Sequence, residues 1–151
     1  MKTPNIILQC MCCNQPFTGK ATPFLTMEPP VCSADCFVWW ITQFSNMPLS
    51  NMAPVTHCNE NEFRSDWERL MANFLDYHQI PYAYEAVAIP VGNKWYIPDF
   101  YLPANGIFFE VKGKWYAGYK KLFVNACKQH PNYFWLLGGH FLKRVGVLHG
   151  N

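Results

Sequence analysis

The chain has 151 residues, of which 50% are hydrophobic and 17% aromatic, and its formal net charge is +2. This length fits one ordinary domain with a small additional module, and the apolar content is high enough to bury a core, which argues against a disordered protein. The apolar runs at 6–8 and 38–41 are too short for a secretory signal or a membrane span. We therefore expect a cytoplasmic protein, and in the cytoplasm clustered cysteines favour metal over disulfides.

The first 44 residues contain five of the seven cysteines. Two pairs, Cys10-x₂-Cys13 and Cys32-x₃-Cys36, have the spacing of thiolates that hold Zn²⁺ tetrahedrally, so residues 1–44 are predicted to form a module with structural zinc. The second pair resembles the knuckle of treble-clef and FCS-type zinc fingers in which the last cysteines begin a helix. That helix would carry the apolar residues Phe37, Trp40, Ile41 and Phe44.

Three other residues leave the predicted ligand set open. Cys12 could compete with Cys13, and His57 or Cys58 could be ligands instead. The latter two fall in residues 45–61, which have prolines and no periodicity and are predicted to be a linker. Reduced cysteines in an apolar core would explain the two pairs without a metal. A zinc module could serve DNA docking, partner docking or stability alone.

Residues 62–151 are predicted to form a second domain of α/β (α+β) class, a mixed sheet with flanking helices in the order α-β-β-β-α-β. A helix over about 66–78 is indicated by the capping-box pattern that begins at Ser65 and by apolar residues at helical spacing. A turn is expected at Gly92-Asn93. In chain order, the other predicted elements are strands over 82–89, 94–100 and 106–112, a helix over 116–130, and strands over 133–137 and 141–148.

Asp99 lies eleven residues before the sequence Glu110-x-Lys112. Because side chains alternate along a strand, Glu110 and Lys112 share one face. A two-residue turn at 105–106 would set Asp99 opposite Lys112, and a turn at 104–105 would set it opposite Glu110. Both registers gather the three groups on one face, whereas a three-residue loop would turn Asp99 away. The prediction therefore depends on the parity of the turn.

Buried carboxylates repel each other unless a cation joins them, and oxygen ligands suit Mg²⁺ or Mn²⁺. Such an ion can polarise a phosphodiester and activate water, while Lys112 could orient that water or neutralise charge on the phosphate. A surface salt bridge between Lys112 and Glu110 or Asp99 is the simpler alternative. Glu68, in the first turn of the predicted helix, could be a third carboxylate of this site as well as the reciprocal cap of Ser65.

Several segments occur in a fixed order: Arg64-Ser65-x-x-Glu68, Tyr82-x-Tyr84-Glu85, Tyr96-x-Pro98-Asp99-Phe100-x-Leu102-Pro103, Asn105-Gly106-Ile107-Phe108 and Glu110-x-Lys112-Gly113-x-Trp115. Over about residues 63–135 they resemble the PD-(D/E)XK nucleases, and within these the phage endonuclease I family of Holliday-junction resolvases. The resemblance implies a homodimer that exchanges elements between subunits and cuts branched DNA with Mg²⁺, in the host cytoplasm if a phage encodes the chain. It implies catalytic roles for Glu68, Asp99, Glu110 and Lys112, with the carboxylates of Asp99 and Glu110 and the backbone carbonyl of Val111 as metal ligands.

The cysteine-rich N-terminus is not part of the resolvase pattern. Lysines that follow the third predicted strand could neutralise phosphates, and an aromatic residue among them could stack on a base. The candidate DNA-binding residues are Arg64, Ser65, Lys114, Trp115, Lys120 and Lys121. A solvated helix face would explain the lysines without DNA, and a core position would explain Trp115.

The sequence therefore predicts a Mg²⁺-dependent endodeoxyribonuclease that hydrolyses phosphodiester bonds in branched DNA, with structural Zn²⁺. The ten Lys/Arg and seven Asp/Glu of residues 62–151 permit nucleic-acid binding without requiring it. One alternative is a duplex endonuclease for restriction, packaging or degradation of a rival genome, to which the zinc module would add duplex contacts. Another is a non-catalytic DNA- or protein-binding adaptor that keeps this fold.

Overall fold

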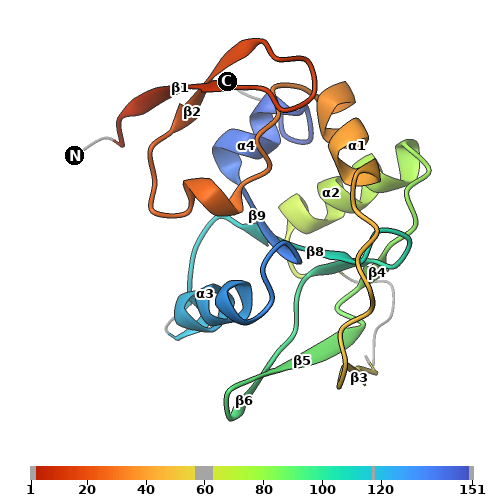
Figure 1. Ribbon diagram of the computed structural model, residues 1–151. Coiled ribbons are helices and arrows are strands. Elements are labelled where there is room, and N and C mark those ends of the chain that lie inside the picture. Colours follow the sequence, from red (N-terminus) through yellow and green to blue (C-terminus); the bar gives the residue numbers. More distant parts are fainter. Residues whose placement is uncertain (1–2, 57–62, 117, 150–151) are drawn as a thin grey trace.

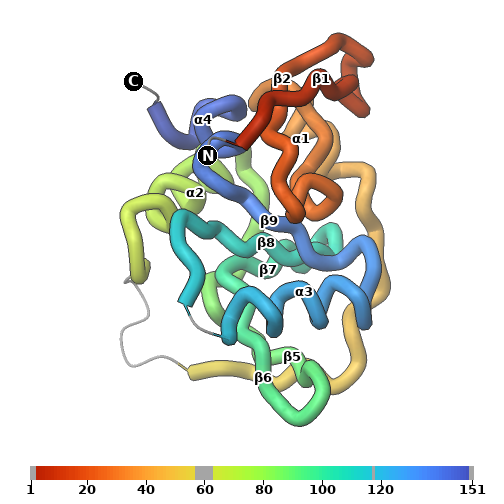
Figure 2. The backbone as a smooth tube through the Cα atoms, turned by 90° about the vertical axis from the view of Figure 1, so that its left-hand side faces the viewer, coloured from red at the N-terminus to blue at the C-terminus, as the bar shows by residue number. Residues whose placement is uncertain are grey.

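The computed structural model describes residues 3–56, 63–116 and 118–149 (Figures 1 and 2). Its N-terminal part contains an antiparallel hairpin, a short 3₁₀ helix and one α-helix: β1 (Asn5–Gln9), β2 (Pro16–Lys20), η1 (Leu25–Met27) and α1 (Ala34–Thr42). No helix in these described ranges is both long and apolar enough to cross a membrane.

A four-stranded mixed sheet lies at the centre of the molecule. Its strands, in spatial order, are β4 (Ala83–Tyr84), β7 (Phe100–Leu102), β8 (Ile107–Lys112) and β9 (Phe134–Gly138). The β8–β9 pair is parallel and the other pairs are antiparallel. A parallel pair needs a crossover connection, which here is α3 (Tyr119–Gln129). A smaller antiparallel sheet has the order β3 (Ala53–Pro54), β5 (Val87–Val91) and β6 (Lys94–Tyr96).

Strand β8 separates two hydrophobic cores because its side chains alternate between the two faces of the sheet. Phe109 faces α1, α2 (Asp66–Tyr77) and α4 (Gly139–Arg144), whereas Phe108 faces α3 and the β5–β6 hairpin. Figures 1 and 2 show these two groups of elements on opposite sides of the sheet. Glu110 and Lys112 have the same strand parity as Phe108, so they belong to the α3 side.

The predicted helix over 66–78 is confirmed as α2, and its cap is confirmed by the hydrogen bond from the Glu68 N–H to the Ser65 hydroxyl oxygen (3.2 Å). The Gly92-Asn93 turn is confirmed between β5 and β6. The helix predicted over 116–130 is shorter, because α3 begins after Gly118, whose φ of 81° is left-handed. The strand predicted over 133–137 is confirmed as β9, shifted by one residue.

Three predicted strands are wrong. The strand over 82–89 is broken into β4 and β5, because the backbone at Glu85 has a φ of 44° and passes from one sheet to the other. The strand over 94–100 is likewise divided between β6 and β7. The segment 141–148 is not a strand, since its first four residues end α4 and its apolar side chains Phe141, Leu142 and Val145 are buried at helical spacing.

The N-terminal module packs directly on the central sheet. Phe37 of α1 lies in the same core as Phe109 of β8 and Phe141 of α4, with ring centroids 5.6 and 5.0 Å away. The segment 45–61, expected to be a linker, is partly structured: Ala53–Pro54 form β3, and the Asn46 side-chain amide donates to the carbonyl oxygen of Gly106 (3.1 Å). The domain boundaries themselves stay a prediction.

Arg144 joins α4 to the N-terminal module. Its Nη2 atom donates to Glu28 Oε1 (2.6 Å), its Nε atom donates to the Val31 carbonyl oxygen (2.9 Å), and its guanidinium lies 4.6 Å from the Phe17 ring centroid. The Arg144 and Glu28 side chains are only 10% and 17% exposed. This ion pair is therefore largely shielded from water.

Replacing Arg144 with methionine should lower the free energy of unfolding by about 2–4 kcal/mol, because Glu28 would keep a buried charge without its partner. Arg69→Met is the matched control, since it removes an ion pair with Asp66 whose side chains are 52% and 85% exposed. It should cost less than about 1 kcal/mol. Equilibrium denaturation in urea measures both, and equal losses would contradict a special role for Arg144.

Candidate functional site

A cleft of about 560 Å³ opens where the first turn of α2 meets the end of β8 and the segment that leads to α3. Carboxylates and cationic side chains line it together, namely Arg64, Glu68, Glu85, Asp99, Lys112 and Lys114. Three acidic groups in one hollow repel one another unless cations balance them. The positions of these groups therefore decide what the cleft can bind.

The pairing of β7 with β8 sets Asp99 beside Glu110. Phe100 pairs with Phe109, so the preceding residue, Asp99, lies opposite Glu110. The connecting loop has four residues, 103–106, and its even length preserves the alternation. Of the two registers left open by the sequence, this is the one expected for a turn centred on 104–105. The Asp99 carboxylate also accepts a hydrogen bond from the Val111 N–H (2.8 Å).

The two carboxylates are buried, with Asp99 5% and Glu110 1% exposed. Burial, together with the negative charge of Glu68, raises the pKa of Asp99 to about 7. Burial and the charge of Asp99 raise the pKa of Glu110 well above its usual range. Glu110 Oε1 accepts from the Tyr96 hydroxyl (2.9 Å), while Oε2 is buried and has no hydrogen-bond partner in the described parts of the chain. A cation at this pair would relieve the repulsion and give Oε2 a partner.

Glu68 lies in the first turn of α2 and is 6% exposed. Its carboxylate accepts a hydrogen bond from the Tyr84 hydroxyl, whose oxygen in turn accepts from the Arg64 N–H (3.0 Å). A capping box would direct this carboxylate to the Ser65 N–H, but here Tyr84 binds it. Glu68 is therefore fixed at the cleft, close enough to Asp99 to raise the pKa of that carboxyl group.

Glu85 is the third carboxylate that lines the cleft, and no role was predicted for it from the sequence. It is 5% exposed, its N–H donates to the Asp99 carbonyl oxygen (2.8 Å), and its Oε2 atom lies 3.1 Å from Arg64 Nε. Its backbone turns the chain from β4 into β5. The signal that could have revealed it was the imperfect alternation of the predicted strand over 82–89, which marks the point where the chain leaves the first sheet.

Lys112 ends β8 and borders the cleft. Its Nζ atom lies 4.9 Å from the Tyr119 ring centroid and 5.9 Å from those of Trp115 and Tyr116. Among the residues that the structure describes, no ion pair joins this ammonium group to Asp99 or Glu110. The salt-bridge alternative is therefore not the arrangement found, and aromatic rings hold the charge at the cleft.

The predicted DNA-binding residues divide into two groups. Arg64, Ser65 and Lys114 line the cleft. The other three do not: Trp115 is half-buried beside the Phe24 and Phe123 rings, Lys120 Nζ lies 5.1 Å from the Phe24 ring centroid, and Lys121 borders a different groove. Of the six predicted residues, only Arg64, Ser65 and Lys114 are therefore placed to contact a substrate in the cleft.

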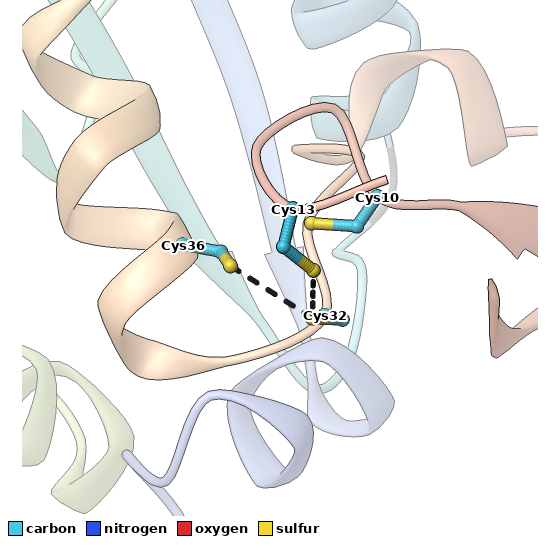
Figure 3. A group of neighbouring side chains, drawn as sticks. All are labelled: Cys10, Cys13, Cys32 and Cys36. Atoms are coloured by element: carbon cyan, nitrogen blue, oxygen red, sulfur yellow. Dashed lines mark hydrogen bonds between the residues drawn. The ribbon is translucent and has the colours of Figure 1, made fainter. Parts of the chain in front are cut away.

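The four cysteines of the predicted zinc module converge (Figure 3). Their sulfur atoms all lie within 4.8 Å of one another, so Cys10, Cys13, Cys32 and Cys36 could bind a metal ion. The first pair lies in the β1–β2 loop, and the second is at the start of α1, where the Cys36 N–H donates to the Ser33 hydroxyl oxygen (3.3 Å). Cys12 is not in this group, and His57 and Cys58 lie outside the described residues.

The thiols of this cluster differ in acidity. Burial works to raise the pKa of Cys10, but the backbone N–H groups of Cys13 and Cys12 outweigh it and bring the pKa to about 6. Burial and the neighbouring Cys13 thiol raise the pKa of Cys32 to about 12. Cys10 is therefore the thiol of this cluster that ionises most readily, and a bound cation would favour ionisation of the others.

Comparisons with known proteins match the C-terminal part of the chain. The family model for phage endonuclease I matches residues 50–134. Endonuclease I of Escherichia phage T7 is 40% identical over 73 residues, which cover 46% of this chain and 48% of that protein. Endodeoxyribonuclease 1 of Enterobacteria phage T3 is 38% identical over 73 residues, covering 46% of this chain and 47% of its own length.

The chain therefore spans about half the length of the curated relatives it matches. A comparison with solved structures gave no significant match. The stretch matched by the family model includes all the carboxylates of the cleft and Lys112, whereas the cysteine cluster and α4 lie outside it.

Proposed function

Because the chain belongs to the phage endonuclease I family, we propose that it is a metal-dependent endonuclease that hydrolyses phosphodiester bonds in DNA. The observation that carries this proposal is the buried pair Asp99 and Glu110, which lies within the stretch matched by the family model. Asp99 of this pair lines the cleft together with Glu68 and Lys112. Two adjacent carboxylates with raised pKa values are costly to keep in a folded protein unless they bind something. The active site is proposed to have the PD-(D/E)XK arrangement.

The cleft fits a hard divalent cation. Its donors are oxygens, and the unpartnered Oε2 of Glu110 is the kind of atom that a metal ion would satisfy. The proposed ligands of Mg²⁺ or Mn²⁺ are the Asp99 and Glu110 carboxylates and the backbone carbonyl of Val111. When bound, the cation would supply Lewis-acid polarisation of the phosphodiester and make water more acidic.

The side chains of the cleft would perform the remaining tasks. Lys112 would orient the attacking water or neutralise charge that develops on the phosphate, because its ammonium group is held at the cleft by aromatic rings. Tyr84 would hold Glu68 in place, and Tyr96 would do the same for Glu110. Arg64, whose side chain is 71% exposed, could contact the neighbouring phosphates.

The preferred substrate is proposed to be branched DNA of the Holliday-junction type, cut by a homodimer in the cytoplasm. The support for branched DNA and for the dimer is the membership of the resolvase family. Linear duplex DNA is the second candidate substrate, because the cysteine cluster lies outside the stretch matched by the family model and could add duplex contacts.

The cysteine cluster is proposed to hold one structural Zn²⁺ in a treble-clef arrangement. The hairpin that presents the first pair and the helix that begins at the second pair support this proposal. Four thiolates complete a tetrahedral site and leave no position for a substrate, so the zinc would stabilise the fold rather than take part in hydrolysis.

Replacing Lys112 with alanine should slow Mg²⁺-dependent cleavage of a four-way junction by about 100-fold or more, because the group that orients water or neutralises phosphate charge is lost. Lys20→Ala is the control, since Lys20 lies on β2, outside the cleft. Junction, fork, linear duplex and single-stranded DNA are compared in parallel. Unchanged cutting by Lys112→Ala would refute the role of Lys112, and an absence of cleavage on every DNA by the wild type would favour a binding adaptor.

A further inference from the structure

A second groove, of about 390 Å³, lies between the β5–β6 turn and α3. Three lysines line it, Lys94 from β6 and Lys121 and Lys128 from α3, together with the amide side chains Asn93, Asn125 and Gln129. We call it the lysine groove. It contrasts with the cleft in chemistry, because none of its lining residues is acidic.

The sequence around the lysine groove contains no neutralising charge. Residues 111–151 have seven Lys/Arg and no Asp or Glu, and residues 86–98 have Lys94 and no acid. Within the described ranges, no ion pair involves any of the three lysines. A concave surface with several cations and no acids favours an anion from outside the chain.

The geometry favours an extended anion over a single small one. Lys121 and Lys128 are seven residues apart on α3, so they lie on the same face of the helix, about 10 Å apart along its axis. Lys94 has the same strand parity as Tyr96, whose ring packs 6.3 Å from that of Phe123 on α3, so Lys94 also faces the helix. The result is a row of cations along the groove, which suits a chain of phosphates.

The lysine groove also adjoins the cleft. Gly118 lines the groove, and the next residue, Tyr119, lines the cleft, so both hollows reach the N-terminal end of α3. Figures 1 and 2 show α3 beside the β5–β6 hairpin along this edge of the molecule. A polyanion that enters the cleft can therefore continue into the groove.

From this placement, we infer that the lysine groove binds the sugar-phosphate backbone of the DNA flank that leaves the cleft. The inference rests on the proposed function and adds a separate binding surface to it. A phosphate backbone is favoured over an acidic protein surface, because the groove combines a row of cations with continuity to the nuclease cleft, and its polar groups are otherwise uncharged amides.

The double variant K121Q/K128Q tests whether the lysine groove binds the DNA flank. The control K20Q/K143Q removes the same charge from β2 and α4, which Figures 1 and 2 show far from α3. DNA binding is measured over a range of salt concentrations, with Ca²⁺ in place of Mg²⁺ to limit cutting. On DNA with long flanks, K121Q/K128Q should weaken binding about tenfold and reduce the slope of log K against log salt by about two. On DNA trimmed to the length of the cleft, K121Q/K128Q should bind like the wild type in Ca²⁺ and should cut the DNA like the wild type in Mg²⁺.

The outcomes separate this inference from the proposed function. If the wild type binds and cuts DNA but K121Q/K128Q and the control have the same salt slope, the lysine groove does not bind the DNA flank. An acidic protein partner then becomes the better explanation of the groove. A loss of binding that is equal on long and trimmed DNA would also overturn it, because the effect would not come from the flank. If the wild type neither binds nor cuts any DNA, the proposed function fails and the groove inference falls with it.

Discussion

Replacing Asp99 with asparagine should abolish Mg²⁺-dependent cleavage and, at the same time, make the metal-free protein more stable above neutral pH. The loss of cleavage should reach about 100-fold or more, because one of the proposed metal ligands disappears. The gain in stability follows from the burial of Asp99 beside Glu110, where the ionised carboxylate is unfavourable. Asparagine can still accept the hydrogen bond from the Val111 N–H, so the local backbone contact is kept.

The sign of the pH dependence follows from the raised pKa. Asp99 has a pKa of about 7 in the folded chain, above its usual value, so the protein binds this proton more tightly when folded. The stability that this provides is fully present below about pH 4 and is lost as the pH rises to about 7. We expect Asp99→Asn to raise the free energy of unfolding by about 1–3 kcal/mol above that pH, and by little in acid.

Thermal unfolding with and without divalent cations measures this effect. Adding Mg²⁺ or Mn²⁺ should raise the melting temperature of the wild type and leave that of Asp99→Asn nearly unchanged, because binding to the native state is what stabilises it. Asp66→Asn is the control, since Asp66 has an 85% exposed side chain in the first turn of the same helix as Glu68. A wild-type protein that is insensitive to both pH and divalent cations would contradict the proposed metal site.

The local parts of the site could be predicted from the sequence. The Ser65 cap fixes the start of α2 and places Glu68 in its first turn. The period of two along β8 puts Glu110 and Lys112 on one face. The position of Asp99 depended on one further fact, the even length of the loop before β8. The sequence alone did not decide which of two strand registers this loop produces. Since both registers have the same parity, the grouping of Asp99 with Glu110 was already expected.

The imperfect alternation over residues 82–89 indicates an irregular strand, but the breaks at Glu85 and before Phe100 could not be located in this way. The chain passes from one sheet to the other at both points, and the two are held together by the hydrogen bond from the Glu85 N–H to the Asp99 carbonyl oxygen. That contact joins residues far apart in sequence, so a pattern read along one strand does not contain it. The same holds for α4, because Phe141 and Arg144 pack against the N-terminal module rather than against a neighbouring strand.

The cysteine spacing predicted the convergence of four thiols, but not the packing of their module on the sheet. Phe37 and Trp40 of α1 are almost completely buried, and their rings lie against Phe109 of β8. A linker composition in residues 45–61 says only that the segment lacks periodicity, and it gives no information on whether the units that flank it touch. The shared core makes the cysteine cluster part of the support of the whole structure.

Removing the proposed Zn²⁺ from the cysteine cluster should therefore unfold more than the N-terminal module. Cys32→Ala should lose one bound zinc per chain and lower the melting temperature by at least about 10 °C, since zinc-binding free energy is folding free energy in such sites. Because α1 shares its core with β8, we expect one cooperative transition and loss of cleavage with it. Zinc analysis, calorimetry and a cleavage assay on the same samples measure the three effects.

Two other cysteine variants show whether the effect is specific. Cys12→Ala should keep the zinc, because Cys12 is outside the group of four. A loss of zinc in this variant would mean that Cys12, and not Cys13, is a ligand. Cys127→Ala, which shortens a half-buried side chain on α3, should keep the zinc and cost about 1 kcal/mol. If Cys32→Ala lost its zinc and yet melted and cut DNA like the wild type, the N-terminal module would be an independent appendage. The core shared by α1 and β8 would then not contribute to the stability of the whole chain.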